Sequence, residues 1–277
     1  MSQQAFIQQL FTCNQKKFVA FPDKELAEQF IDQIFDLLFL PNIGKQQNLG
    51  KFEKEFESLK SHFSSLIYDV LLDGDKAQAV TENFFDELPS LYSDLMNDAK
   101  AISEFDPAAQ SIQEVIMAYP GFYATTVYRL SHQLCKQGVK TLPRIFTEHA
   151  HSKTGIDIHP GASIGGSFFI DHGTGIVIGE TTIIGNNVKI YQGVTLGALN
   201  VSKELAKVKR HPTIQDNVII YSGATILGGG TVIGHDSVIG GNVWLTTSVP
   251  SHSIVYHKSE LAIRDKNPLP EGLNFVI

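Results

Sequence analysis

Three polar clusters interrupt the glycine-rich second half of the chain, and their side chains are suited to acid–base and anion-binding chemistry. They are Asp157, the pair Asp171-His172, and the run Lys209-Arg210-His211. A neutral imidazole suits removal of a proton near pH 7, because its unperturbed pKa is about 6.5. A carboxylate on the other ring nitrogen would fix the tautomer and stabilise the imidazolium. We therefore expect His172 to be a general base and Asp157 to be its partner.

The same residues also fit plain structural roles, and the residue types leave both open. His172 could bond a backbone carbonyl in a turn, and the Asp171 carboxylate could cap that turn. Arg210 and His211 could simply end a solvated loop.

The elements that position these clusters follow from a six-residue period. A mostly aliphatic series runs Ile158, Ile164, Ile170, Ile178, Ile184, Ile190, Leu196, Ile214, Ile220, Ile226, Val232, Val238 and Trp244. It is interrupted by two extra residues after Ile170 and by an excursion over 198–212. The period is neither helical nor strictly alternating. Three such units form one triangular coil with stacked aliphatics inside, so the pattern predicts a parallel β-helix.

The first half of the chain has a different character. Of 23 glycines, 18 follow residue 150, whereas 15 of 18 phenylalanines precede it. Apolar stripes at helical spacing predict helices, with a cap at Asp23, a break at Asp73-Gly74 and a short helix from Asp106-Pro107 to about Met117. The expected fold class is α+β. An all-α domain over 1–152 precedes a β-helix over 153–258 and a flexible tail over 259–277.

Composition excludes several classes of protein. The net charge of −7 argues against a nucleic-acid surface, and no apolar run approaches the roughly 18 residues of a membrane span. Cys13 and Cys135 form neither a disulfide framework nor a C-x-x-C pair. The N-terminus lacks the layout of a signal peptide. We expect a cytoplasmic protein with no nucleic-acid or membrane partner.

The polar clusters and the repeat together resemble a known family. The string DIHPGASIGGSFFIDHGTGIVIGETTIIGNNVKIYQGVTLGA resembles the signature of the serine O-acetyltransferases, and EFDPAA, YPGFYATTVYRLSH, KRHPTI and GATILGG extend the similarity over about residues 100–250. The resemblance implies a left-handed β-helix of hexapeptide repeats. It also implies acetyl transfer from acetyl-CoA to the hydroxyl of L-serine, for cysteine biosynthesis, in a trimer or a dimer of trimers.

The resemblance also implies roles for individual residues. His172 would be the general base, with Asp157 as its partner. The residues that would hold serine are Asp106, Asp171, Arg210 and His211, and those beside acetyl-CoA are Gly197, Gly223 and Ala224. No metal is implied. A C-terminal tail ending in Ile277 would insert into cysteine synthase.

The excursion departs from the family pattern. Its segment NVSKELAKVK has longer side chains and more charges than the glycine-rich stretch that is common in the family. Lys203, Lys207 and Lys209 could meet phosphates of coenzyme A, or could simply be solvated.

Three other functions stay open. The same fold could acetylate another acceptor, such as a sugar, homoserine or an antibiotic. A zinc hydratase of the carbonic-anhydrase type would need three histidines to converge between subunits, from among His159, His172, His211 and His235. A non-catalytic scaffold would leave the polar clusters without a shared purpose.

Overall fold

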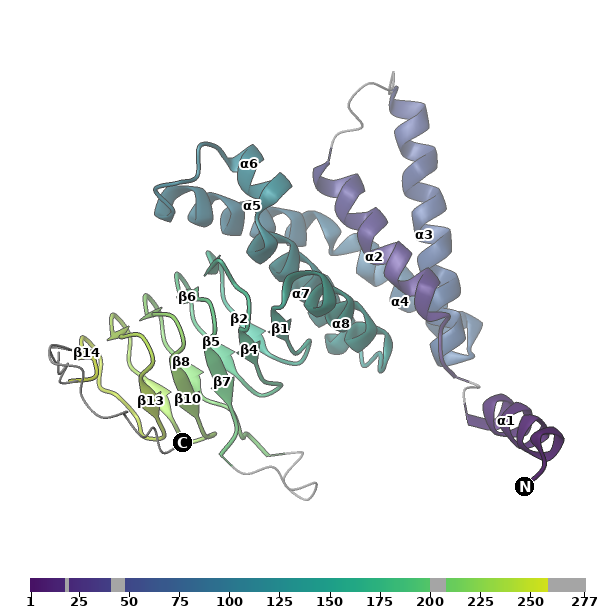
Figure 1. Ribbon diagram of the computed structural model, residues 1–277. Coiled ribbons are helices and arrows are strands. Elements are labelled where there is room, and N and C mark those ends of the chain that lie inside the picture. The colour runs from purple at the N-terminus through teal and green to yellow at the C-terminus, as the bar shows by residue number, and fades with distance from the viewer. Residues whose placement is uncertain (18–19, 41–47, 200–207, 259–277) are drawn as a thin grey trace, which may run out of the picture.

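The computed structural model of the protein describes residues 1–17, 20–40, 48–199 and 208–258 and consists of a helical region followed by a solenoid (Figure 1). The helices in these ranges are α1 (Gln3–Lys17), α2 (Lys24–Phe39), α3 (Leu49–Leu71), α4 (Gly74–Asp86), α5 (Leu88–Phe105), α6 (Ile112–Ala118), α7 (Pro120–Lys136) and α8 (Leu142–Thr154). Helix α1 stands apart from the others, whereas α5, α7 and α8 lie against the first coils of the solenoid.

The helix ends follow local capping chemistry. The Asp23 carboxylate accepts from the Leu26 amide, and the Asp73 carboxylate accepts from the Lys76 amide, each at 3.1 Å, so both predicted boundaries are confirmed. The short helix predicted to end near Met117 is present as α6, but its predicted start at Asp106 is wrong.

Asp106 instead ends α5, and α6 begins only at Ile112, where Ser111 supplies the cap. The Asp106 carboxylate accepts from the Ala108 amide and the Tyr119 hydroxyl, so the chain first turns through 107–111.

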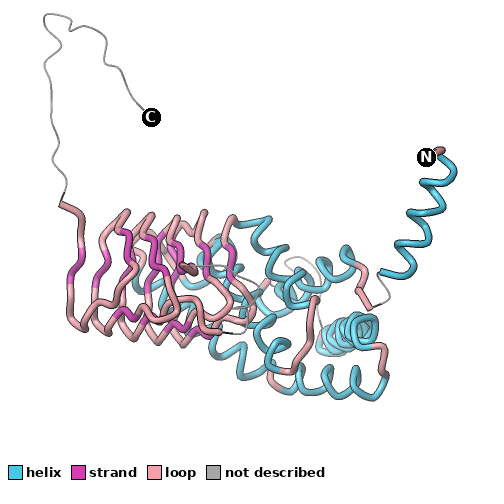
Figure 2. The backbone as a smooth tube through the Cα atoms, turned by 90° about the horizontal axis from the view of Figure 1, so that it is seen from below, coloured by secondary structure: helices cyan, strands magenta, loops and turns pink. Residues whose placement is uncertain are grey.

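The solenoid is a triangular prism with three parallel sheets as its faces, stacked coil upon coil (Figure 2). Face A contains β1 (Asp157–Ile158), β4 (Val177–Ile178), β7 (Thr195–Gly197), β10 (Thr225–Leu227) and β13 (Trp244–Leu245). Face B contains β2 (Ser163–Ile164), β5 (Ile183–Ile184), β8 (Thr213–Ile214) and β11 (Val232–Ile233). Face C contains β3 (Phe169–Asp171), β6 (Lys189–Tyr191), β9 (Ile219–Ile220), β12 (Val238–Ile239) and β14 (Ile254–Val255).

Three corners join the faces and are named here by the faces they connect. The AB corner includes 159–162, 179–182, 198–199 and 208–212. The BC corner includes 165–168, 215–218, 234–237 and 250–253. The CA corner includes 172–176, 192–194 and 221–224.

The predicted aliphatic ladder holds as far as Ile226. Ile178, Leu196 and Ile226 stack on face A in register and are fully buried or nearly so. Beyond Ile226 the predicted phase is wrong by one residue. The buried residues there are Ile233 and Ile239, whereas Trp244 is 63% exposed and Leu245 packs inward in its place.

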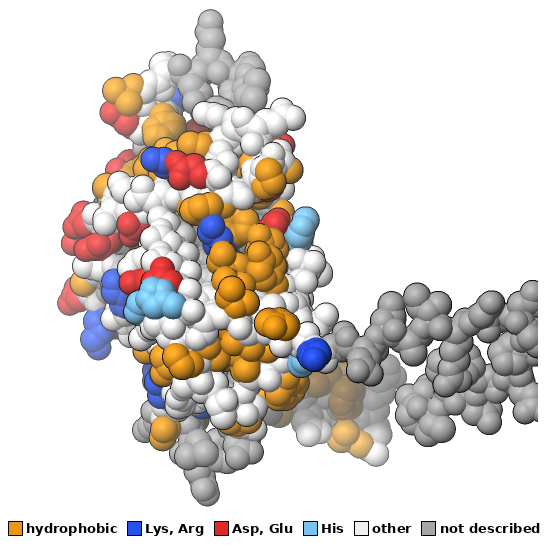
Figure 3. Space-filling view, turned by 90° about the vertical axis from the view of Figure 1, so that its left-hand side faces the viewer, with side chains coloured by type: hydrophobic (Ala, Val, Ile, Leu, Met, Phe, Trp, Pro, Cys, Tyr) orange, Lys and Arg blue, Asp and Glu red, His pale blue; other side chains and the backbone are white. Residues whose placement is uncertain are grey.

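The slip has a simple cause. The chain takes seven residues rather than six from Ile226 to Ile233, because β10 has a third residue, Leu227, before the corner at Gly228. Trp244 therefore joins Ile254 and Tyr256 among the exposed hydrophobic side chains of the last coils. Seen from the free end of the solenoid, hydrophobic side chains gather over the middle of the view, and most acidic side chains lie toward its left-hand edge (Figure 3).

A buried ion pair joins the helices to the solenoid. Arg129 of α7 donates to both carboxylate oxygens of Asp98 of α5, at 2.6 and 3.0 Å, and Asp98 is completely buried. The guanidinium also donates to the carbonyls of Ile164 and Gly165, at 3.3 and 2.7 Å, and Asp98 accepts from the Phe168 amide at 2.8 Å. The pair thus bonds backbone groups at the BC corner of the first coil.

We predict that Asp98→Asn destabilises the protein by about 3–5 kcal/mol, because it leaves the Arg129 charge buried without a counter-charge. Chemical denaturation followed by circular dichroism measures the loss. Glu104→Gln is the control, since it breaks an exposed pair in which Lys100 lies 3.7 Å away, and such pairs contribute about 1 kcal/mol at most. Similar losses in the two variants would contradict the prediction.

Candidate functional site

The first group of site residues lies at the CA corner. Asp171 ends β3, and His172 follows it with a left-handed backbone (φ 57°). The His172 side chain is 71% exposed, and its Nε2 lies 3.7 Å from Oδ1 of Asp171, which is largely covered. The turn therefore directs an imidazole toward solvent beside a carboxylate, an arrangement that can accept a proton from a bound hydroxyl.

Asp106 joins this group from the helical region. Its Oδ2 accepts from the Tyr119 hydroxyl at 2.6 Å, and its Oδ1 accepts from the Ala108 amide at 2.8 Å. The hydrogen bond to Asp106 raises the pKa of Tyr119 to about 12, and the negative charge of Asp171 acts in the same direction. Two carboxylates thus lie close enough to Tyr119 to act on the same hydroxyl.

An aromatic row on face C adjoins these carboxylates. The ring centroids of Phe169 and Tyr191 lie 6.0 Å apart, and those of Tyr191 and Tyr221 lie 5.1 Å apart. Burial raises the pKa of the Tyr191 hydroxyl, and the charges of Asp171 and Asp106 raise it further. Tyr191 therefore belongs to the same electrostatic environment.

The second group lies at the AB corner, where the excursion returns to the coil. The Thr181 hydroxyl accepts from the backbone amides of Arg210 and His211, at 2.9 and 3.1 Å. The Arg210 guanidinium forms an ion pair with the Glu180 carboxylate. The end of the excursion is thereby fastened to the preceding corner, and a guanidinium is held at the AB corner.

His211 has a defined protonation state. Its side chain is buried, and burial together with the Arg210 charge lowers its pKa to about 4. Its Nδ1 accepts from the Thr181 amide at 3.0 Å, so the ring is neutral near pH 7 and carries its proton on Nε2. A methyl group on Gly179 would lie 2.1 Å from that Nε2, so only glycine leaves room for the ring.

Asp157 lies on the outer side of face A. Its carboxylate pairs with Arg144 of α8, whose Nη1 lies 3.8 Å from Oδ1, and its charge acts on the half-buried His159. Within the described part of the chain no hydrogen bond or ion pair joins Asp157 to His172. The pairing of these two residues stays a prediction.

The small residues expected beside acetyl-CoA lie on two corners. Gly197 ends β7 beside the AB corner, and its carbonyl accepts from the Gly228 amide at 3.0 Å. Gly223 belongs to the CA corner, where a methyl group on the preceding coil's Gly193 would come within 3.5 Å of its Cα. The Ala224 side chain is fully buried in the solenoid core, so it has no surface for a neighbouring molecule to contact.

Of the three lysines predicted to meet coenzyme A, the structure describes only Lys209. The Lys209 ammonium donates to the carbonyls of Thr181 and His211, at 3.0 and 2.8 Å, and so helps to hold the AB corner. Lys203, Lys207 and the tail ending in Ile277 lie outside the described residues.

The side chains that could hold a metal within one chain are not the set of histidines that the zinc-hydratase hypothesis named. Over the described ranges, two groups of histidine and acidic side chains have all their ligand atoms within 4.8 Å of one another: His235, Asp236 and His252, and Glu148, His151 and Asp157. Neither group contains His159, His172 or His211.

None of the described helices is long and apolar enough to span a membrane.

The two site groups are separated by the width of face A. His172 precedes β4, whereas Glu180, which holds Arg210, follows it. Three residues of extended chain already span about 10 Å. The two groups therefore lie at opposite edges of face A, on different corners of the coil.

Sequence reasoning missed Tyr119 and Glu180 as members of these groups. Glu180 had only the appearance of a surface turn residue. Tyr119 has no local signal, because α6 lies between it and Asp106 in the sequence. Glu180 and Arg210 are 30 residues apart in the sequence and meet because they lie at the same corner of consecutive coils.

Known proteins share this arrangement. Residues 46–127 match the family model described as "Serine acetyltransferase, N-terminal". A plasmid-encoded serine acetyltransferase of Synechococcus elongatus is 53% identical over 196 residues, which are 69% of this chain and 60% of that protein. A serine acetyltransferase of Bacillus licheniformis is 47% identical over 180 residues, 65% of this chain and 82% of that protein.

A solved structure extends the likeness to the whole fold. Serine acetyltransferase 1 of Entamoeba histolytica, in complex with L-cysteine, superposes with a TM-score of 0.76 at 35% identity, covering 90% of this chain and 96% of that one. The helical region and the parallel solenoid both correspond. By sequence and by fold, the chain belongs to the serine acetyltransferase family of acyltransferases.

Proposed function

We propose that the protein transfers the acetyl group of acetyl-CoA to the hydroxyl of L-serine, with His172 as the general base. The observation that carries this proposal is the sorting of charges between the two corners that flank face A. Two carboxylates and an exposed imidazole lie at the CA corner, and a guanidinium and a neutral imidazole lie at the AB corner. An amino acid carries the complementary charges.

The substrate's charged groups have matching partners. Arg210 suits the serine carboxylate, because a guanidinium can donate two parallel hydrogen bonds to it. The Nε2–H of His211 is a neutral donor for the same carboxylate. Asp106 and Asp171 suit the ammonium group. The L-cysteine of the Entamoeba complex has the same ammonium and carboxylate as serine.

The separation of the two groups favours an oligomer. In a closed ring, different patches of neighbouring copies meet at each interface. A threefold ring would place the CA corner of one copy beside the AB corner of the next, which completes a site at every interface. We therefore propose a trimer or a dimer of trimers, with each serine held by two copies.

The reaction then proceeds by direct transfer. His172 removes the serine hydroxyl proton as the oxygen attacks the thioester carbonyl. Backbone N–H groups near Gly197 stabilise the oxyanion of the tetrahedral intermediate. When the carbon–sulfur bond breaks, the imidazolium returns the proton to the thiolate, which gives O-acetyl-L-serine and coenzyme A. Asp157 would stabilise the imidazolium.

Acetyl-CoA and one macromolecular partner complete the proposal. The glycines that stack along the CA corner would let the pantetheine arm lie against the backbone at Gly223. The tail ending in Ile277 would present a free carboxylate on an apolar side chain to cysteine synthase, in the cytoplasm. A carboxylate of this kind can mimic an amino-acid substrate.

We predict that His172→Ala lowers kcat by at least about a hundredfold, because a positioned general base contributes about 10²–10⁴ in rate. Release of free thiol from acetyl-CoA, with L-serine, L-homoserine and sugar acceptors in parallel, measures the activity. His257→Ala is the control, an exposed histidine that bonds the Asn242 carbonyl. Near-normal turnover of His172→Ala, or wild-type preference for another acceptor, would contradict the assignment.

The shared site predicts complementation between two inactive variants. His172→Ala and Arg210→Gln are each expected to be inactive alone. When they are co-expressed with different affinity tags, random mixing should restore up to about a quarter of wild-type activity, because some interfaces then pair an intact CA corner with an intact AB corner. Purified mixed oligomers without recovered activity would rule out a site shared between copies.

Tyr119 is expected to position Asp106. Tyr119→Phe removes one of the two hydrogen bonds to the carboxylate and should raise KM for serine roughly tenfold, while KM for acetyl-CoA and kcat change little. Steady-state kinetics with each substrate varied separates these effects. Tyr92→Phe, on a ring stacked against Phe39, is the control. Equal KM values for serine in the two variants would refute the positioning role.

A further inference from the structure

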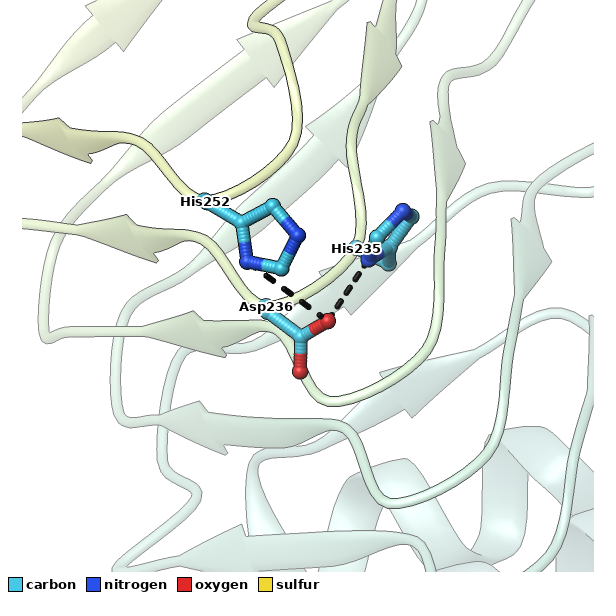
Figure 4. Close-up of side chains that lie close together, drawn as sticks. All are labelled: His235, Asp236 and His252. Atoms are coloured by element: carbon cyan, nitrogen blue, oxygen red, sulfur yellow. Dashed lines mark hydrogen bonds and ion pairs between the residues drawn. The ribbon is translucent and has the colours of Figure 1, made fainter.

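We infer that the BC corner of the last two coils is a surface site for a divalent transition metal such as Zn²⁺, with His235, Asp236 and His252 as ligands. The close-up shows the two imidazoles and the carboxylate turned toward one another from adjacent corners (Figure 4). This site is separate from the CA and AB corners, so it does not depend on the proposed acetyl transfer.

The ligand atoms already lie near coordination distance of one another. Nδ1 of His235 lies 2.6 Å from Oδ2 of Asp236, and Nδ1 of His252 lies 3.9 Å from the same oxygen. One ligand atom from each residue lies within 4.8 Å of the others. Zinc holds nitrogen and oxygen at about 2.0–2.2 Å, which places tetrahedral ligands about 3.4 Å apart. A metal would replace the hydrogen bond between His235 and Asp236, so these two atoms would move apart by about 0.8 Å, while a small rotation would bring the exposed His252 ring closer.

The backbone of the solenoid holds these ligands in place. The His252 amide donates to the His235 carbonyl at 2.9 Å, which stacks the two corners directly. The Asp236 amide donates to the Asp216 carbonyl at 3.0 Å, and the other carboxylate oxygen of Asp236 accepts from the Asn217 side chain at 3.0 Å. Such outer contacts orient a ligand before the metal arrives.

The charges favour a cation here over the other ligand group. Across the described ranges, the ion-pair partners of Asp236 are His235 and His252, and no lysine or arginine pairs with it. At Glu148, His151 and Asp157, by contrast, the Arg144 guanidinium pairs with both carboxylates. A built-in cation thus occupies that second group, whereas the BC corner has none.

The ligand types indicate the class of metal. Two imidazoles and one carboxylate suit zinc, nickel or copper better than calcium or magnesium, which prefer oxygen. The three side chains are 40–71% exposed, so water can fill the remaining coordination positions. Bound metal would tie together the corners 234–237 and 250–253 and so fasten the last coil.

Calorimetric titration of the full chain, without an affinity tag, with Zn²⁺ tests this inference. We expect one strong site per chain. His252→Asn should weaken the affinity at least about tenfold, and Asp236→Asn should do the same. Asparagine tolerates the left-handed backbone at both positions (φ 59° and 56°), so the fold should persist, which circular dichroism checks.

Two matched variants make the outcome decisive. His257→Ala removes an exposed histidine outside the cluster and should bind Zn²⁺ like the wild type. His151→Ala disables the second ligand group and should also retain the strong site. The inference fails if the wild type shows no strong site, if His252→Asn binds as tightly as the wild type, or if the loss appears in His151→Ala instead.

Discussion

The buried pair of Asp98 and Arg129 is the contact on which the functional arrangement depends. The first coil of a solenoid ends in backbone groups with no further coil to bond, and these groups must be satisfied in another way. Arg129 and Asp98 bond two carbonyls and one amide there while neutralising each other. Because Asp98 anchors α5 at this place, Asp106 at the end of the same helix reaches the CA corner. One ion pair therefore sets the helical contribution to the site.

Much of the fold could be predicted from the repeat, because a period that matches one prism face has few alternative structures. The prediction was wrong where a single extra residue, Leu227, moved Trp244 outward and Leu245 inward. A strict count of six cannot detect such a residue, because β11 and β12 each have a valine next to an isoleucine, so an aliphatic side chain stands at both the predicted and the observed position. The start predicted at Asp106 for the helix that ends near Met117 was wrong for a different reason. An Asp-Pro pair can also form a turn, and here the Asp106 carboxylate bonds the Ala108 amide and the Tyr119 hydroxyl instead of capping a helix.

The sequence predicted the two clusters of the candidate site but not the contacts that hold their side chains in place. His172 and Arg210 stood out because each breaks the repeat with a polar group. The sequence contained no sign that Thr181 fixes the tautomer of His211, because that contact crosses 30 residues and depends on the stacking of two corners. It also contained no sign that face A separates the two clusters, which depends on where each corner falls around the prism.

The return of the 198–212 excursion to the ladder has a consequence for how this protein can change. Leu196 and Ile214 lie on consecutive strands of one coil, although 18 residues separate them where six would suffice. The strands before and after the excursion still pair in register with their neighbours, at Leu196 with Ile178 and at Ile214 with Ile184. Insertions and deletions ahead of Lys209 therefore need not change the register of the paired strands. Over evolutionary time the segment beside Arg210 can be lengthened, shortened or recoded while the scaffold is inherited unchanged.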